Sequence, residues 1–141
     1  MLWKHPPNLD HLNAMNANTL GETLGIEFTE AGDDFIVARM PVDDRTVQPF
    51  RLLHGGASVA LAETLGSVAS SLCIEDLGKK MPVGVEINAN HLRPARSGYV
   101  YGKVSPIRVG RTMHVWNIEI RDEKGRLTCV SRLTVAVVEK T

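Results

Sequence analysis

QPFRLLHGGASVALAETLGSVASSL, residues 48–72, predicts a loop that passes through a Gly-Gly turn into one long helix. Gly55 and Gly56 suit a tight turn, and from Ala57 onward the segment has no Pro and few β-branched residues. At helical spacing, one side carries the apolar residues Ala57, Leu61, Leu65, Val68 and Leu72. The opposite side carries Val59, Ala60, Glu63, Ser67 and Ser70, where a surface helix would have several charges. We therefore expect a helix that protein covers nearly all round.

Glu63 is the only full charge between Arg51 and Glu75. A carboxylate in a confined place is costly unless it is paired, hydrogen-bonded or protonated. Glu63 is therefore either a structural ion-pair member, with Arg51 or a neighbouring subunit, or a group held for chemistry, with Ser67 on the same face to hold it. The helix pattern alone leaves both interpretations open.

Composition limits the classes of partner. The 141 residues correspond to one domain, residues 1–141, and the 16 acidic and 16 basic residues give no net charge. This balance argues against a nucleic-acid surface or an electrostatic membrane patch and favours a small molecule or another protein. Cys73 and Cys129 lack disulfide or metal-site spacing, and the N-terminal segment lacks an apolar core. We expect free thiols and a cytoplasmic protein.

The order of elements predicts the fold class. Asn8 after two prolines predicts the start of a short helix, and a second short helical turn should cover residues 19–24. Strands are expected over residues 26–31, 35–42, 83–93, 99–106, 112–121 and 126–138. Short connections predict that the last four form an antiparallel meander. We expect an α+β fold in which a curled antiparallel sheet wraps around the one long central helix.

Four segments carry a resemblance to a known family: PVDDRTVQPF (41–50), LHGGAS (53–58), Ala62-Glu63 and GVEINANH (84–91). From about Leu20 to its end, the chain resembles the acyl-CoA thioesterases of the hotdog superfamily. It is most similar to the bacterial group with an active-site Glu on the central helix. That group includes 1,4-dihydroxy-2-naphthoyl-CoA hydrolases, proofreading thioesterases of enterobactin synthesis and 4-hydroxybenzoyl-CoA thioesterases, and the first of these is the closest likeness.

The resemblance implies a hydrolase that converts an acyl-CoA to free acid and CoA. The acyl group would be aromatic, such as 1,4-dihydroxy-2-naphthoyl or hydroxybenzoyl, or of medium chain length, and the first of these implies menaquinone biosynthesis. Coenzyme A would be part of the substrate, with no separate cofactor and no metal. A long unpaired sheet edge also predicts a dimer with a continuous sheet, and the family pairs such dimers into homotetramers.

The resemblance also implies roles for the central segment. Gly55, at the positive end of the helix dipole, would offer its N–H to the thioester oxygen. Glu63 would act as a nucleophile, forming a mixed anhydride, or as a general base on water. Gln48 and His54 would lie near the thioester, and Ser67 would position Glu63 or a water. Each site would take Glu63 from one subunit and the loop from Gln48 to Gly55 from the other.

Coenzyme A needs an apolar channel that ends in basic residues. The candidate contacts to substrate and coenzyme are Val68, His91, Arg93, Arg108, Gly110 and Arg111. Two other functions use the same fold. One is a hydratase or dehydratase acting on a β-hydroxyacyl group, and the other is a non-catalytic domain that binds or senses acyl-CoA. The combination of Gln48, HGG and Glu63 fits hydrolysis better than either.

Overall fold

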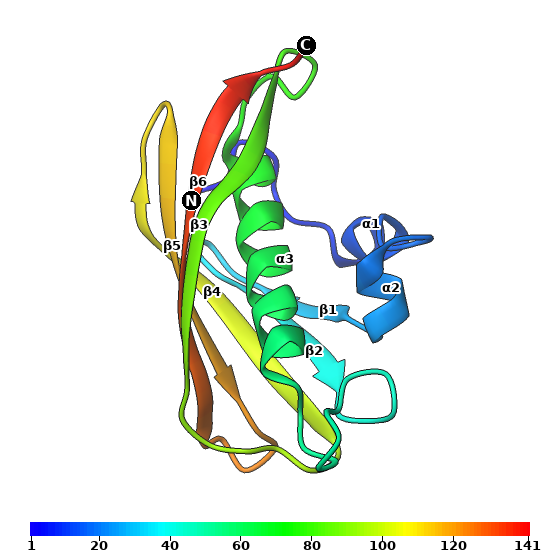
Figure 1. Ribbon diagram of the computed structural model, residues 1–141. Helices are drawn as coiled ribbons and strands as arrows, with labels where there is room; N and C mark the ends of the chain where they lie inside the picture. The colour runs from blue at the N-terminus through cyan, green and yellow to red at the C-terminus, as the bar shows by residue number, and fades with distance from the viewer.

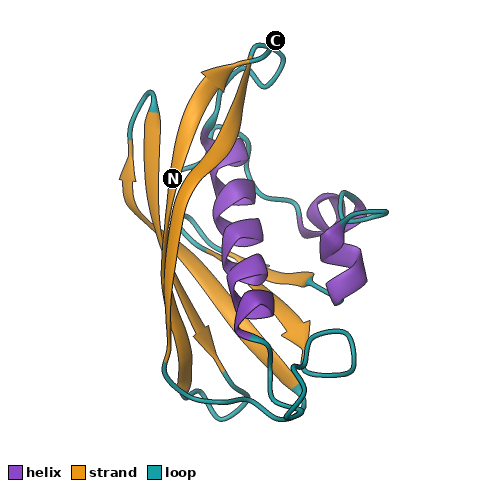
Figure 2. Ribbon diagram, viewed as in Figure 1, coloured by secondary structure: helices purple, strands orange, loops and turns teal.

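A six-stranded antiparallel sheet curls around helix α3 (Gly55–Cys73) in the computed structural model, which describes residues 1–141 (Figure 1). Figure 2 shows the single long helix lying against one face of the sheet, with two short helices apart from it. The remaining elements are α1 (Leu9–Ala14), α2 (Leu20–Leu24), β1 (Glu27–Ala31), β2 (Ile36–Pro41), β3 (Lys80–His91), β4 (Tyr99–Val109), β5 (Met113–Arg121) and β6 (Leu127–Glu139). The predicted curled sheet around one central helix is confirmed. None of the helices is long and apolar enough to cross a membrane.

The core lies between α3 and the concave face of the sheet. Leu61 and Leu65 of α3 are fully buried against side chains such as Trp116 and Ile118, which alternate with half-buried residues along β5. Complete burial of a side chain of this size contributes about 1.5–3 kcal/mol. This packing fixes the height of α3 above the sheet and therefore the place of Glu63.

The predicted meander of the last four strands is wrong in one respect. The strand order is β1-β2-β4-β5-β6-β3, so β3 pairs with β6 and not with β4. Residues 92–98 connect β3 to β4 across the ends of two strands, a span of about 14 Å that seven extended residues cover easily. The N–H of Leu92 donates to the Thr128 carbonyl (2.8 Å) and Leu53 donates to the Ala95 carbonyl (2.8 Å), which holds this connection beneath α3.

Helix α3 also differs from its prediction. It begins at Gly55, so the two glycines form its first turn instead of a separate turn before it. The prediction that protein covers the helix nearly all round is wrong for a single chain, because Glu63, Ser67 and Val68 are only half-buried. Ser70, placed on the side opposite the apolar stripe, is fully buried and faces the sheet. The buried side of α3 is set by small residues that allow close packing and not by the large apolar ones alone.

The two edges of the sheet are treated differently. At the β1 edge, the Asn13 side chain of α1 donates to the Phe28 carbonyl (3.0 Å) and accepts from the Phe28 N–H (2.7 Å), so α1 covers the free backbone. The β3 edge is twelve residues long, pairs only with β6, and exposes Val85 by 59%. A long uncovered edge of this kind is a template for pairing with another chain.

Candidate active site

The first turn of α3 leaves one backbone donor free. His54 is the N-cap, and its Nδ1 accepts the N–H of Gly56 at 2.8 Å. The N–H groups of Ala57 and Ser58 donate to the His54 carbonyl. The N–H of Gly55 has no partner in the chain. Gly55 therefore presents an unpaired N–H donor at the positive end of the helix dipole. A donor in this position can stabilise an oxygen atom that gains negative charge during a reaction.

The His91 ring lies against Gly55. A Cβ atom added at Gly55 would be only 3.0 Å from His91 Nε2, so the backbone here can be approached closely only because residue 55 has no side chain. Both residues line a cavity of about 370 Å³ beside the start of α3, together with Gln48 and Arg93. The structure thus brings four of the predicted site residues to one place.

His54 and Gln48 do not both face this cavity. Gln48 lines it, while its Oε1 accepts the N–H of Phe50 in its own loop. His54 is exposed, and its Nδ1 is engaged in capping α3. His54 therefore stabilises the first turn of α3 and orients the backbone N–H groups of that turn. It does not line the cavity itself.

Glu63 lies two turns further along α3 and has no ion pair or hydrogen bond within the chain. Arg51, one of its expected partners, pairs instead with Asp44, so that interpretation is wrong. Ser67 makes no hydrogen bond with Glu63, and its carbonyl accepts from the Ser71 hydroxyl at 3.1 Å. A half-buried carboxylate without a partner is not a structural ion-pair member of this chain.

Gly84 of β3 is a site residue that the sequence reasoning missed. A Cβ atom added there would be 2.5 Å from Glu63 Oε2, so the carboxylate rests directly on the backbone of Gly84. A glycine inside a strand marks a close approach of another group, and this was the signal in the sequence. Gly84 sets the position of Glu63 at the free edge of the sheet.

Val68 faces a different hollow. It lines an apolar groove of about 410 Å³ between α1 and α3, with Leu12, Met15 and Leu72. Val68 follows Glu63 by five residues on the same helix, on the face turned away from the sheet. Glu63 does not line this groove.

Arg108 lies near the end of β4, and Gly110 and Arg111 lie in the turn between β4 and β5, which Figure 1 shows at the opposite end of the molecule from residues 92–98. Gly110 and Arg111 line a cavity of about 640 Å³ next to the C-terminal end of α3. A helix of 19 residues is about 28 Å long, so this turn is far from Gly55 and Arg93 of the same chain. One chain therefore does not bring the two sets of predicted coenzyme contacts together.

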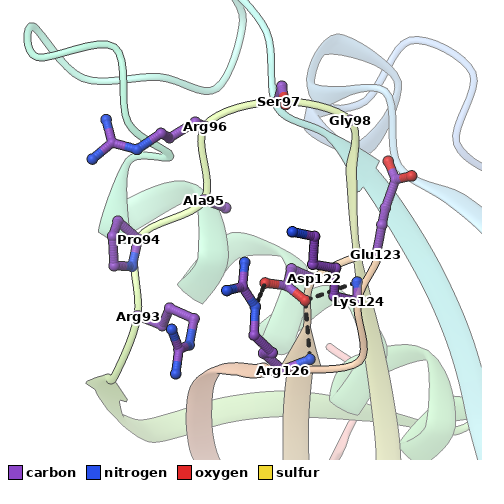
Figure 3. A pocket seen from close by; sticks show the side chains of 10 residues that line it. All are labelled: Arg93, Pro94, Ala95, Arg96, Ser97, Gly98, Asp122, Glu123, Lys124 and Arg126. Carbon is purple, nitrogen blue, oxygen red and sulfur yellow. Dashed lines mark hydrogen bonds and ion pairs between the residues drawn. The ribbon is translucent and has the colours of Figure 1, made fainter.

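Arg93 also lines a cavity of about 540 Å³, shown in Figure 3, whose lining has four basic side chains and two carboxylates. Arg93, Arg96 and Lys124 have no ion pair, whereas Arg126 pairs with Asp122 at 2.8 Å. Burial alone would raise the pKa of Asp122, but hydrogen bonds from Arg126 and Lys124 lower it. The sequence reasoning missed Arg96 and Lys124, because only the fold brings the 92–98 connection beside the β5–β6 turn.

Neither cysteine is suited to be the nucleophile. Both are buried and free. Burial raises the pKa of the Cys73 thiol to about 11, against a weaker opposite effect of Lys4, and burial also raises the pKa of Cys129. Because the thiolate is the reactive form, both thiols are inert near neutral pH.

A curled antiparallel sheet wrapped around one helix is the hotdog fold, and solved thioesterases share it with this chain. The structure of a mutant of thioesterase PA1618 from Pseudomonas aeruginosa superposes with a TM-score of 0.97 at 51% identity, covering 99% of this chain and 100% of the other. A family model described as Thioesterase superfamily matches residues 50–129, and the chain belongs to this superfamily. The protein is therefore a thioester hydrolase of the hotdog class.

Two curated relatives are similar over nearly their whole length. A 1,4-dihydroxy-2-naphthoyl-CoA hydrolase from Escherichia coli is 55% identical over 138 residues, which are 98% of this chain and 100% of the relative. The proofreading thioesterase EntH of Cronobacter turicensis is 52% identical over 138 residues, 98% of this chain and 99% of the relative. The first name specifies an acyl group and the second does not, so the similarity defines the thioesterase class and not the acyl group.

Proposed function

We propose that the protein hydrolyses acyl-CoA thioesters with Gly55 and Glu63 as the two central groups. The unpaired Gly55 N–H at the start of α3 carries this proposal. The thioester oxygen accepts this N–H, which stabilises the negative charge that develops when the carbonyl carbon is attacked. Either Glu63 takes a proton from the attacking water, or Glu63 attacks and the resulting anhydride is hydrolysed. In both routes the C–S bond breaks and the thiol of CoA leaves.

This chemistry requires two copies of the chain. Gly55 and Glu63 are eight residues apart on one helix, which separates them by about 12 Å along its axis. One carbonyl group cannot contact both. The free edge of β3 offers the second copy, because antiparallel pairing of two β3 strands places two α3 helices side by side in opposite directions.

The contacts of β3 indicate the register of this pairing. Gly84 touches Glu63, and His91 touches Gly55. A two-fold axis halfway between them, near Ile87 and Asn88, sets Gly84 of one copy beside His91 of the other. The same operation brings Glu63 of one copy to Gly55 of the other, so each dimer has two complete sites.

The same arrangement supports assignments for the rest of the substrate. At each shared site, Arg93 comes from the copy that supplies Gly55, and Arg111 comes from the copy that supplies Glu63. Both arginines then lie on the same side of the site, beyond Glu63, where the phosphates of CoA would be bound. The apolar groove at Val68 suits an aromatic or medium-chain acyl group. The name of the Escherichia coli relative supports an aromatic group such as 1,4-dihydroxy-2-naphthoyl, and with it menaquinone biosynthesis. Coenzyme A enters as part of the substrate, so no further cofactor is needed.

A panel of aromatic and aliphatic acyl-CoAs, with thiol release followed by a thiol reagent, tests the reaction. Hydrolysis releases one thiol for each thioester consumed, whereas a hydratase, a dehydratase or a binding domain releases none. The largest kcat/KM within the panel identifies the acyl group. An absence of thiol release from every member would refute the proposal.

Mixed dimers test the shared site. Glu63→Ala and Gly55→Val should each be inactive alone, but refolding the two together gives dimers with one intact site and one doubly altered site. Random pairing should then restore roughly a quarter of the wild-type activity. No recovery, with mixed dimers shown to form, would mean that each site lies within one chain. Sedimentation velocity would show whether the dimers pair further into tetramers.

A further inference from the structure

A buried hydrogen-bonded trio, Ser70, His114 and Trp116, connects α3 to β5. Ser70 and Trp116 are fully buried, and His114 is 2% exposed. Trp116 Nε1 donates to Ser70 Oγ at 2.7 Å, and His114 Nδ1 is 2.9 Å from the same oxygen. The proposed hydrolysis uses none of these groups. Polar side chains kept in an otherwise apolar core need another explanation.

Ser70 Oγ is the shared atom of the trio. The indole N–H can only donate, so Ser70 Oγ accepts from Trp116, and a second hydrogen bond joins the same oxygen to His114 Nδ1. Burial lowers the pKa of His114, and a backbone hydrogen bond with Gly110 acts more weakly in the opposite direction.

Gly110 belongs to the turn that carries Arg111. This turn is closed by the Gly110 N–H, which donates to the Met113 carbonyl at 2.9 Å, and Val109 pairs with His114 across it. Gly110, Arg111 and His114 all line the cavity at the C-terminal end of α3. The charged residues around that cavity are Lys4, Glu75, Asp76, Lys80 and Arg111. His114, near the start of β5, therefore ties this turn to the helix that carries Glu63 through its hydrogen bond with Ser70.

We propose that His114 is a positioning residue that fixes the β4–β5 turn to α3, so that Arg111 is held at the right height to meet a phosphate of the coenzyme. This inference rests on the proposed function, specifically on the nucleotide end of CoA binding at Arg111. A fixed turn lowers the cost of ordering Arg111 when the coenzyme binds. His114 acts on binding of the nucleotide and not on the bond that is cleaved.

Two amide substitutions test the bond between His114 and Ser70. His114→Asn places an amide near the position of Nδ1 and keeps this bond, while His114→Gln places its amide near the position of Nε2 and loses it. His114→Gln should raise KM for an acyl-CoA about five- to tenfold with kcat changed less than twofold, the scale of one lost hydrogen bond. His114→Asn should keep KM within about twofold of wild type, since the bond to Ser70 is retained. KM for the matching acyl-pantetheine, which lacks the nucleotide, should not change in either variant.

Equal effects of the two amides, or equal losses on acyl-CoA and acyl-pantetheine, would overturn the proposal and leave His114 as a core residue only. If His114→Gln does not fold, Ser70→Ala removes the same bond from the helix side and should show the same difference between the two substrates. Arg111→Ala tests separately whether the nucleotide of CoA binds at Arg111, which the positioning role of His114 requires. An increased KM for acyl-CoA in Arg111→Ala but not in the His114 and Ser70 variants refutes only the positioning role. An unchanged KM in Arg111→Ala would show that the nucleotide does not bind at this turn. The positioning role of His114 would then be refuted, whereas the proposed hydrolysis at Glu63 would not be affected.

Discussion

Replacement of Gly84 by Ala should disable the enzyme without unfolding it. The new Cβ would lie 2.5 Å from Glu63 Oε2, whereas ordinary contacts begin at 3.4 Å. The carboxylate must therefore move by about 1 Å, and a misplacement of that size commonly costs about 100-fold in rate. Gly84 is not among the left-handed glycines, Gly25, Gly98 and Gly125, so Ala fits the backbone at this position. Stability should be unchanged or higher by about 0.4–1 kcal/mol, because Ala restricts the unfolded chain.

The assay is kcat on the best acyl-CoA, with the melting temperature taken on the same preparation. A double-mutant cycle gives the control: in a Glu63→Ala background the carboxylate is absent, so Gly84→Ala should have no further effect on the residual rate. An equal fold-loss in both backgrounds would refute the reasoning, because the methyl group would then act on something other than Glu63. A wild-type rate for Gly84→Ala alone would show that the position of the carboxylate does not limit catalysis.

Three further predictions follow from the same geometry. Glu63→Ala should lower kcat at least ~100-fold while the melting temperature stays the same or rises, since no partner within the chain is left unpaired; a well-folded variant with near-normal turnover would contradict this. Arg93→Ala should raise KM for acyl-CoA about tenfold, as expected for one lost contact to a phosphate, and should leave acyl-pantetheine unaffected; Lys103→Ala, on a surface away from the cavities, is the control. Burial lowers the pKa of His114 below its ordinary 6.5, so the unfolded state binds more protons and stability should fall as the pH drops below about 6.5. Urea unfolding at several pH values would show a weaker decline for His114→Gln.

The fold could be predicted because each long element carries its own signal. The central helix has no Pro and few β-branched residues from Ala57 onward, and the strands are bounded by turns such as Gly32–Asp34 and Asp122–Gly125. The pairing of β3 could not be predicted, because seven connecting residues are compatible with a neighbouring strand or with one three places away. Strand order depends on contacts between distant residues, and connection length limits it only weakly.

The candidate site could also be predicted only in part, because some of its residues lie in recognisable motifs and others are brought together only by the fold. Gln48, Gly55, His91 and Arg93 were all candidates from the sequence, and the structure places them around one cavity. The first three lie in the segments that carry the resemblance. Gly84 was within such a segment but received no role, since its importance comes from where Glu63 points. Arg96 and Lys124 had no local signal at all, because two separate loops come together only in the folded chain.

The β-bulge in β3 explains how one strand serves both halves of the site. Gly84 and His91 are seven residues apart, and in a regular strand residues an odd number apart face opposite sides of the sheet. The pairing with β6 shifts by one residue between Gly84 and Glu86, so Val85 is an extra residue. This shift turns both Gly84 and His91 toward α3, where one touches Glu63 and the other Gly55. A glycine and a bulge both weaken a strand, and finding them together beside the carboxylate indicates that β3 is shaped by the site and not by the stability of the sheet.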